Sequence, residues 1–318
     1  MYKLWVQKPD GNSRSDIGIE ALKKQLFQYI LFFLGLALIS AAVVFLIVWK
    51  NKEAGEKKDL LRYWDAGSYS EAYEKSGDIL KRSPLDSFVL TMRGFVSYQL
   101  ALAQINNAGA LVYVDECILS LRRALLKNPD RNGRIRYVLG KAYYVKGSDY
   151  ADLSIRYLTE AREASYTAED LSEYLGLAYA AVHNYRKSVE EFSKALKPLD
   201  SGASDRLLIA IADSYMGMED WESARAYLMR CIEQSKDADI IFQSRLKLGK
   251  ALYQTGDIPG AIAAYTLILE GGIESAEACY ELGEIYAVQG ETIRARAAYR
   301  RAYRADPSYG PALARLNM

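Results

Sequence analysis

The chain has 318 residues, half of them apolar and a quarter charged, so it can bury a sizeable core and is not disordered by composition. Its 41 basic and 40 acidic residues give a net charge of +1 without a long run of one sign, which argues against a nucleic-acid-binding protein. A single histidine, His183, excludes a metal site with several histidines, and three distant cysteines provide neither a disulfide framework nor a metal knuckle.

The first predicted element is an apolar helix over residues 26–49, a stretch without a charged residue. At about 1.5 Å per residue it spans roughly 36 Å, which is enough to cross a hydrocarbon core of about 30 Å. Lys23 and Lys24 precede it, and Trp49 and Lys50 end it, as expected at the two membrane–water boundaries. A cleaved signal peptide is the competing interpretation, but its apolar core is only about 7–15 residues long. The sequence therefore predicts a single-pass transmembrane helix after a short N-terminal tail, residues 1–25.

The flanking charges do not decide which side of the membrane carries the rest of the chain. Four basic residues lie within twenty residues before the apolar helix and five lie after it. The unpaired cysteines favour a reducing compartment only weakly. The orientation therefore stays open at this point.

The rest of the chain repeats itself at intervals close to 34 residues. The last copy contains Leu282, Gly283, Tyr286, Gly290, Ala295, Tyr299, Ala302 and Pro307. Successive equivalents of its glycine fall at 60, 94, 140, 176, 212, 249 and 283. Large residues in such a pattern fill holes on a facing helix, and small residues let two backbones approach. Because one helix pair cannot bury its own apolar face, the copies are expected to stack in a row.

This pattern resembles the tetratricopeptide repeat (TPR) family, whose helix-turn-helix unit carries the signature W-x2-L-G-x2-Y…A-x3-F…P. The resemblance implies an all-α fold, a right-handed superhelical α-solenoid of about seven repeats preceded by the transmembrane helix. The repeats are expected within a solenoid at 50–309, at residues 53–86, 87–132, 133–168, 169–204, 205–241, 242–275 and 276–309, with a C-terminal capping helix at 310–318. The 46-residue copy has twelve extra residues around 101–113 and an expected turn at Asn106–Gly109, either a docking hairpin or tolerated length.

No motif for catalysis stands out. The sequence contains no GxxxxGK[ST] phosphate loop, no GxSxG elbow and no HExxH. The three cysteines fit small, buried positions of the repeats, and His183 lies in an inter-helix turn where glycine is usual. The sequence therefore predicts that the protein is not an enzyme and has no cofactor, metal or small-molecule substrate.

In the TPR family the first helix of each repeat lines the concave face, and fixed positions of that helix point into the groove. The resemblance thus implies protein or peptide partners. The partner-binding residues expected on this basis are Tyr98, Arg134, Tyr137, Lys141, Tyr144, Asp213, Lys250 and Tyr253; Phe88, Phe95, Asp170, Glu173, Tyr280 and Glu284 occupy further groove positions. Tyr98, Tyr137, Lys141 and Tyr144 are the expected principal contact surface. The alternative is that they only pack the helix pairs.

The predicted function is that of a membrane-anchored protein–protein interaction scaffold, for assembly of a secretion, envelope or flagellar-motor complex. The layout resembles bacterial inner-membrane proteins that carry their repeats in the periplasm, which gives the expected location. Two alternatives remain: a non-catalytic regulatory subunit of a membrane enzyme or motor complex, and an organellar import receptor facing the cytosol. The named groove positions lack the asparagine of the family's clamp for chaperone tails, which disfavours that use.

Overall fold

The computed structural model describes residues 13–196 and 204–316, except for the side chains of residues 13–33 and of Asn107. Residues 1–12 of the expected tail, 197–203 of the fourth expected repeat and 317–318 of the expected cap lie outside the described residues. All regular elements of the described part are helices and none is a strand, which confirms the all-α prediction. Contacts divide the chain into two units, Met1–Arg82 and Ser83–Met318.

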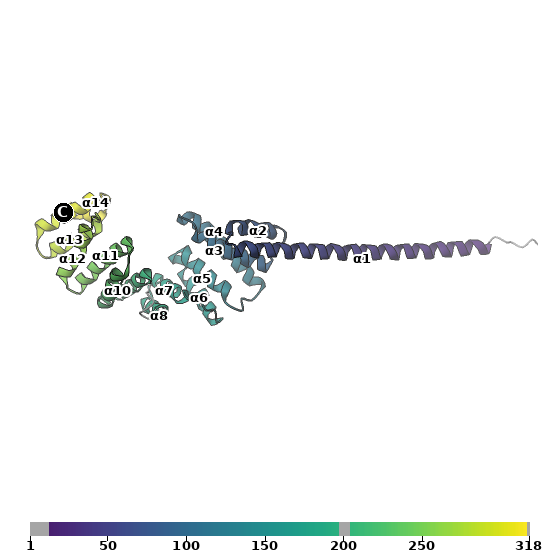
Figure 1. Cartoon of the computed structure of the whole chain (residues 1–318), viewed down its shortest axis with the longest axis horizontal. Helices are drawn as coiled ribbons and strands as arrows, with labels where there is room; N and C mark the ends of the chain where they lie inside the picture. The colour runs from purple at the N-terminus through teal and green to yellow at the C-terminus, as the bar shows by residue number, and fades with distance from the viewer. Residues whose placement is uncertain (1–12, 197–203, 317–318) are drawn as a thin grey trace, which may run out of the picture. The chain divides into compact units, whose positions relative to one another are not determined.

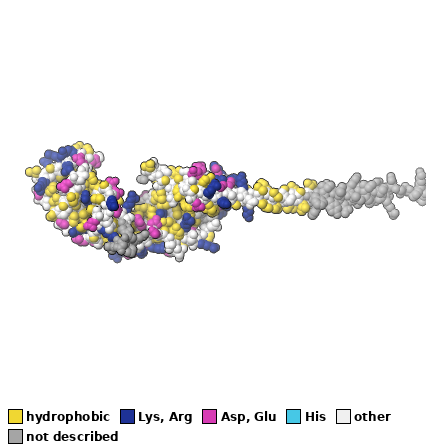
Figure 2. Space-filling model, viewed as in Figure 1, with side chains coloured by type: hydrophobic (Ala, Val, Ile, Leu, Met, Phe, Trp, Pro, Cys, Tyr) yellow, Lys and Arg dark blue, Asp and Glu magenta, His cyan; other side chains and the backbone are white. Residues whose placement is uncertain are grey.

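The helices of the first unit are α1 (Ser13–Asp65) and α2 (Tyr69–Arg82), which form a hairpin. Nearly every side chain of the apolar stretch from Leu34 to Trp49 is exposed, and Figure 2 shows these side chains along α1 in yellow. From Leu34 to Asp65 the helix is long and apolar enough to cross a membrane. Its C-terminal part instead packs against α2, where Ala72 and Ile79 are buried.

The second unit consists of helix pairs that follow one another along the chain (Figure 1). The pairs are α3 (Ser87–Leu102) with α4 (Asn107–Lys127), α5 (Arg134–Lys146) with α6 (Ala151–Glu163), α7 (Leu171–Ala181) with α8 (Tyr185–Ala195), α9 (Asp205–Gly217) with α10 (Trp221–Gln234), α11 (Ala238–Gln254) with α12 (Ile258–Glu270), and α13 (Ala276–Val288) with α14 (Thr292–Ala305), followed by α15 (Gly310–Leu316). A short 3-10 helix, Ser148–Tyr150, precedes α6.

Contacts between pairs define two layers. Each second helix packs against the first helix of the next pair, and α3, α5, α7, α9 and α11 also contact one another in that order. No comparable contact joins two successive second helices of the described chain. The first helices are therefore the more closely spaced layer, which is the inner layer of a curved stack, and the second helices form the outer layer. The array is an α-solenoid, as predicted.

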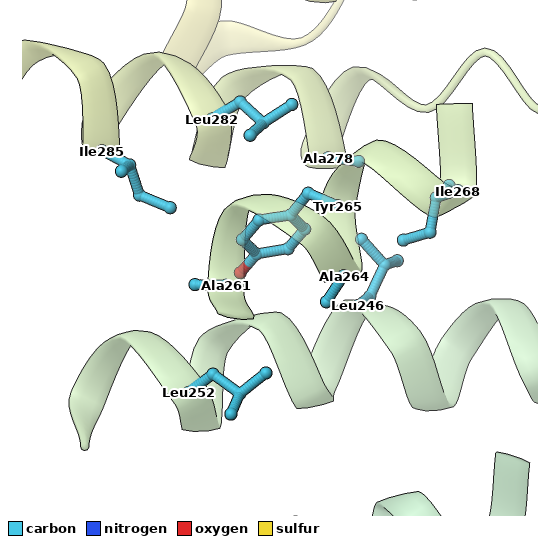
Figure 3. Packing of buried hydrophobic residues seen from close by; sticks show 9 residues of the cluster. All are labelled: Leu246, Leu252, Ala261, Ala264, Tyr265, Ile268, Ala278, Leu282 and Ile285. Atoms are coloured by element: carbon cyan, nitrogen blue, oxygen red, sulfur yellow. The ribbon is translucent and has the colours of Figure 1, made fainter. Parts of the chain in front are cut away.

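Each pair is held together by a large side chain set against a small residue. In Figure 3, Tyr265 of α12 lies between α11 and α13, among Leu252, Leu282 and Ile285. A Cβ atom on Gly249 of α11 would lie 2.5 Å from Cζ of Tyr265, so only glycine admits the ring at this distance. Gly283 and Tyr299 repeat the arrangement in the last pair, where the corresponding distance to the ring is 2.4 Å. The spacing of small and large residues in the sequence thus encodes the packing of the pairs.

Two turns between helices can be compared with the predictions, the turn at His183 and the turn before α4. His183, between α7 and α8, has φ +58°, the left-handed conformation that glycine adopts at Gly256 and Gly290 in the equivalent turns. The extra residues of the second expected repeat mostly lengthen α4, which is 21 residues long. The turn comes slightly earlier than expected, because Asn106 caps α4 by accepting a hydrogen bond from the Gly109 amide.

Candidate functional site

The predicted principal surface centres on α5. Arg134, Tyr137, Lys141 and Tyr144 lie three, four and three residues apart, which places them on one face of this helix. The helix starts after Gly133, whose φ of +72° and close approach to the Ala161 carbonyl leave no room for a side chain. Because α5 contacts both α3 and α7, this face lies between the neighbouring helices of the inner layer.

Lys141 is at the centre of this cluster. Its Nζ atom lies 4.4 Å from the ring centroid of Tyr174, 5.0 Å from that of Tyr137 and 5.6 Å from that of Tyr98. At these distances a cation is attracted to the face of an aromatic ring. The Lys141 side chain is 13% exposed, so the rings of three helices shield most of it from water. We call Tyr98, Tyr137, Lys141, Asp170 and Tyr174 the lysine cluster.

Asp170, at the start of α7, neutralises the ammonium group. Lys141 Nζ donates a hydrogen bond to Asp170 Oδ2 at 2.7 Å, and the Tyr137 hydroxyl donates another to Oδ1. Lys141 also donates to Tyr137 Oη at 3.1 Å. The charge of Lys141 is therefore balanced by a carboxylate of the protein itself, and this ion pair links two successive helix pairs.

The electrostatics of the lysine cluster follow from burial and these hydrogen bonds. Burial alone would raise the pKa of Asp170, but the hydrogen bonds from Lys141 and Tyr137 and the lysine charge together lower it. Burial and the negative charge of Asp170 raise the pKa of Glu173. Burial also raises the pKa of Tyr98, and the neighbouring Tyr174 hydroxyl adds to the effect. Among the described residues, the buried Tyr98 hydroxyl has no hydrogen-bond partner of ordinary geometry, although the Tyr174 hydroxyl interacts with it.

Two predicted residues flank the lysine cluster and are more accessible. The guanidinium carbon of Arg134 lies 4.8 Å from the ring centroid of Phe95, and the side chain is exposed. Tyr144 is half-buried and meets Tyr174 edge-on, with ring centroids 5.5 Å apart. Arg134 and Tyr144 thus offer a charge and an aromatic edge beside the shielded lysine.

The other predicted residues lie further along the array. Asp213 of α9 forms an ion pair with Lys247 of α11. Lys250 of α11 is exposed, whereas Tyr253 is partly buried against the core shown in Figure 3. The eight predicted residues thus form one group on α3 and α5 and another on α9 and α11. Tyr174 belongs to the lysine cluster although it was not among the predicted residues.

The three cysteines are all buried, and burial raises the pKa of each thiol. A thiol held in its protonated form is a poor nucleophile and a poor metal ligand. Among the described residues no group of three or more His, Cys, Asp and Glu side chains could hold a metal ion.

Comparison with known proteins agrees with this architecture. Residues 209–273 and 246–310 match the family described as tetratricopeptide repeat. Residues 209–310 therefore carry the TPR pattern, the helix pairs of the second unit share the TPR fold, and a candidate N-terminal transmembrane helix lies in α1. None of the curated proteins compared with it matches its sequence.

Several solved structures share the fold. The C-terminal part of a TPR repeat-containing protein from Cytophaga hutchinsonii is 16% identical, with 82% of this chain and all of that chain covered and a TM-score of 0.60. PilF from Pseudomonas aeruginosa is 14% identical, with 70% and 96% covered and a TM-score of 0.52. A TPR protein from Parabacteroides merdae is 15% identical, with 82% and 98% covered and a TM-score of 0.50. At these identities the likeness shows the fold alone, and the TPR fold suggests a protein–protein interaction scaffold.

Proposed function

We propose that the protein is a membrane-anchored scaffold that binds a segment of a partner protein on the inner face around α5. The exposed Arg134 guanidinium and the half-buried Tyr144 ring, on the same face of α5 beside the shielded lysine cluster, are the observation that carries this proposal. Tyrosine and arginine are among the side chains that are enriched at the energetically important positions of protein interfaces.

The lysine cluster and its neighbours have different roles in this proposal. Lys141 is engaged by Asp170 and fixes the rings of Tyr137 and Tyr174. Arg134 and Tyr144 remain accessible and would contact the partner directly. Asp213, Lys250 and Tyr253 would extend the contact along the same layer if the partner segment is long enough.

The anchor in this proposal is the apolar part of α1. Its exposed apolar side chains have no protein to cover them within the described residues, and a lipid bilayer would bury them. The helix continues without a break from this part to the turn before α2, so a retained anchor would connect the membrane rigidly to the first helix pair. A protein anchored in this way keeps a bound partner concentrated at the membrane.

Photocrosslinking in membranes tests the inner-face site. A photoreactive phenylalanine analogue in place of Tyr144 is expected to crosslink a partner protein, whereas the same analogue in place of Ser193 on α8 is not. Arg134→Glu is expected to lower the yield, and Arg186→Glu, an equal charge change on exposed α8, serves as its control. Equal crosslinking from Tyr144 and Ser193, or no effect of Arg134→Glu, would count against this site.

We further propose that the protein lies in a bacterial inner membrane with its repeats in the periplasm, where it assists assembly of a secretion, envelope or flagellar-motor complex. Protease treatment of cells with a permeabilised outer membrane is expected to digest the repeats while the inner membrane is intact. Digestion only after rupture of the inner membrane would place the repeats in the cytosol instead.

A further inference from the structure

The last pair of the array has an unusual distribution of charge. Helix α14 contains no acidic residue and five arginines, Arg294, Arg296, Arg300, Arg301 and Arg304. Like charges three or four residues apart destabilise a helix. Figure 2 shows dark blue side chains gathered at the end of the array where Figure 1 places α14.

Most of these arginines have no ionic partner among the residues that the structure describes. Arg294 forms an ion pair with Glu291 at 2.8 Å, but no carboxylate of the described residues lies within 4.0 Å of a basic nitrogen of Arg301 or Arg304. Some arginines elsewhere in the array are paired, such as Arg93 with Glu116, Arg136 with Glu160 and Arg162 with Glu191, whereas others, such as Arg134 and Arg186, have no ion pair among the described residues. What distinguishes α14 is that several arginines lie together on one helix that has no acidic residue.

Arg294, Arg301 and Arg304 line one side of a groove between α12 and α14, with a cavity of about 600 Å³. Leu269, Leu282 and Ala298 contribute apolar surface to the same cavity, and Glu270 is the only acidic residue among the described residues that line it. Three arginines and one glutamate leave the lining with a net charge of +2. The volume is within the usual range of about 300–1,000 Å³ for ligand-binding pockets.

We propose that this outer groove binds an acidic peptide segment of a partner protein that also carries apolar side chains. Guanidinium groups form paired hydrogen bonds with carboxylates, and the apolar lining would bury aliphatic side chains of the same segment. From Arg294 to Arg304 the helix rises about 15 Å, which equals the length of four or five extended residues. Two helical walls around a cavity fit a peptide chain better than the flat surface of a bilayer. The site is distinct from the inner face around α5.

The test uses the full chain in nanodiscs of neutral phosphatidylcholine. The probe is a fluorescein-labelled peptide of ten alternating glutamates and leucines, and its counterpart has glutamine in place of glutamate. Fluorescence anisotropy is expected to show at least tenfold tighter binding of the acidic peptide. Arg301→Glu with Arg304→Glu should abolish this preference. The control, Arg296→Glu with Arg300→Glu, makes the same charge change on the same helix outside the groove and should alter binding less than twofold.

A second variant tests the groove without any change of charge. Ala297 lines the cavity, so Ala297→Trp should fill it and weaken binding at least tenfold, with helix content confirmed by circular dichroism. The proposal fails if wild type binds both peptides equally, if both charge-reversal pairs lose binding equally, or if Ala297→Trp binds normally. Capture of the nanodiscs by phosphatidylglycerol vesicles that depends on Arg301 and Arg304, without peptide binding, would assign the arginines to a lipid surface and overturn it as well.

Discussion

The inner face at α5 and the outer groove at α14 differ in whether their basic side chains have a carboxylate partner. Lys141 is surrounded by aromatic rings and bonded to Asp170 of the next pair. Arg301 and Arg304 line a cavity without a carboxylate partner in the described chain. A side chain with its full set of partners contributes to the fold, whereas a set of like charges without partners costs stability unless a ligand compensates it.

This difference changes how the candidate residues of α5 should be tested. A substitution of Lys141 would disturb the junction between two pairs as well as any contact with a partner. A loss of binding would then not distinguish the two causes. Substitutions of Arg134 and of the arginines of α14 separate loss of a partner contact from disturbance of the fold more clearly, because the fold depends less on these residues.

The largest expected effect on stability is at the ion pair between Lys141 and Asp170. Asp170→Ala leaves the mostly buried ammonium of Lys141 without its carboxylate, and we expect a local loss of about 2 kcal/mol; the figure is below that for a fully buried pair because Asp170 is 37% exposed. Hydrogen exchange of amides in α5 and α7 measures this loss. The double variant Asp170→Ala/Lys141→Met should recover part of it, and a change below about 0.5 kcal/mol in the single variant would contradict a structural role.

Acidification should affect the same site in two opposite steps. The pKa of Glu173 is raised in the folded protein, so its contribution to stability increases as the pH falls through that pKa toward about 4.3. The pKa of Asp170 is lowered, so its contribution is complete above about pH 4 and is lost as the pH falls through the folded value. Each step should be about 1 kcal/mol or less, because both groups are partly exposed.

Two neutral variants separate these steps. Glu173→Gln should remove the gain of stability on acidification, and Asp170→Asn should remove the loss. The measurement is the free energy of urea unfolding of each variant minus that of wild type, taken at each pH between 3 and 7. If both differences are independent of pH, the carboxylates are not coupled to the fold as described.

Sequence reasoning could reach the fold because the repeat encodes contacts within a pair. Gly249 and Tyr265 occupy fixed positions of one repeat, and their contact follows from the family pattern. The contact of Lys141 with Tyr174 crosses from one pair to the next, and it depends on how the pairs stack. The sequence therefore indicated the face of α5 but not that Asp170 neutralises its lysine. Likewise, the arginines of α14 are visible in the sequence, but the cavity beside them exists only in the folded array.

A smaller and more local effect is expected at the end of the array. Arg315 of α15 donates hydrogen bonds to both carboxylate oxygens of Glu284 on α13, at 2.7 and 2.5 Å. These hydrogen bonds are the largest cause of the lowered pKa of Glu284. Arg315→Gln should increase hydrogen exchange in α15, because the helix has only seven residues and depends on this attachment. Amides of α11 should be unaffected, and unchanged exchange in α15 would show that apolar contacts alone hold it.

The smallest expected effect on stability is at Arg301 and Arg304, which have no ion pair among the described residues. It contrasts most clearly with the loss expected for Asp170→Ala. Arg301→Gln with Arg304→Gln removes two like charges from α14 and breaks no ion pair of the described residues, so stability should stay within about 0.5 kcal/mol of wild type or rise slightly. Hydrogen exchange of α13 and α14 measures it, at low salt where repulsion is largest. A loss comparable to that of Asp170→Ala would mean that these arginines hold the last pair together, and the contrast between a paired inner face and an uncompensated outer groove would no longer stand.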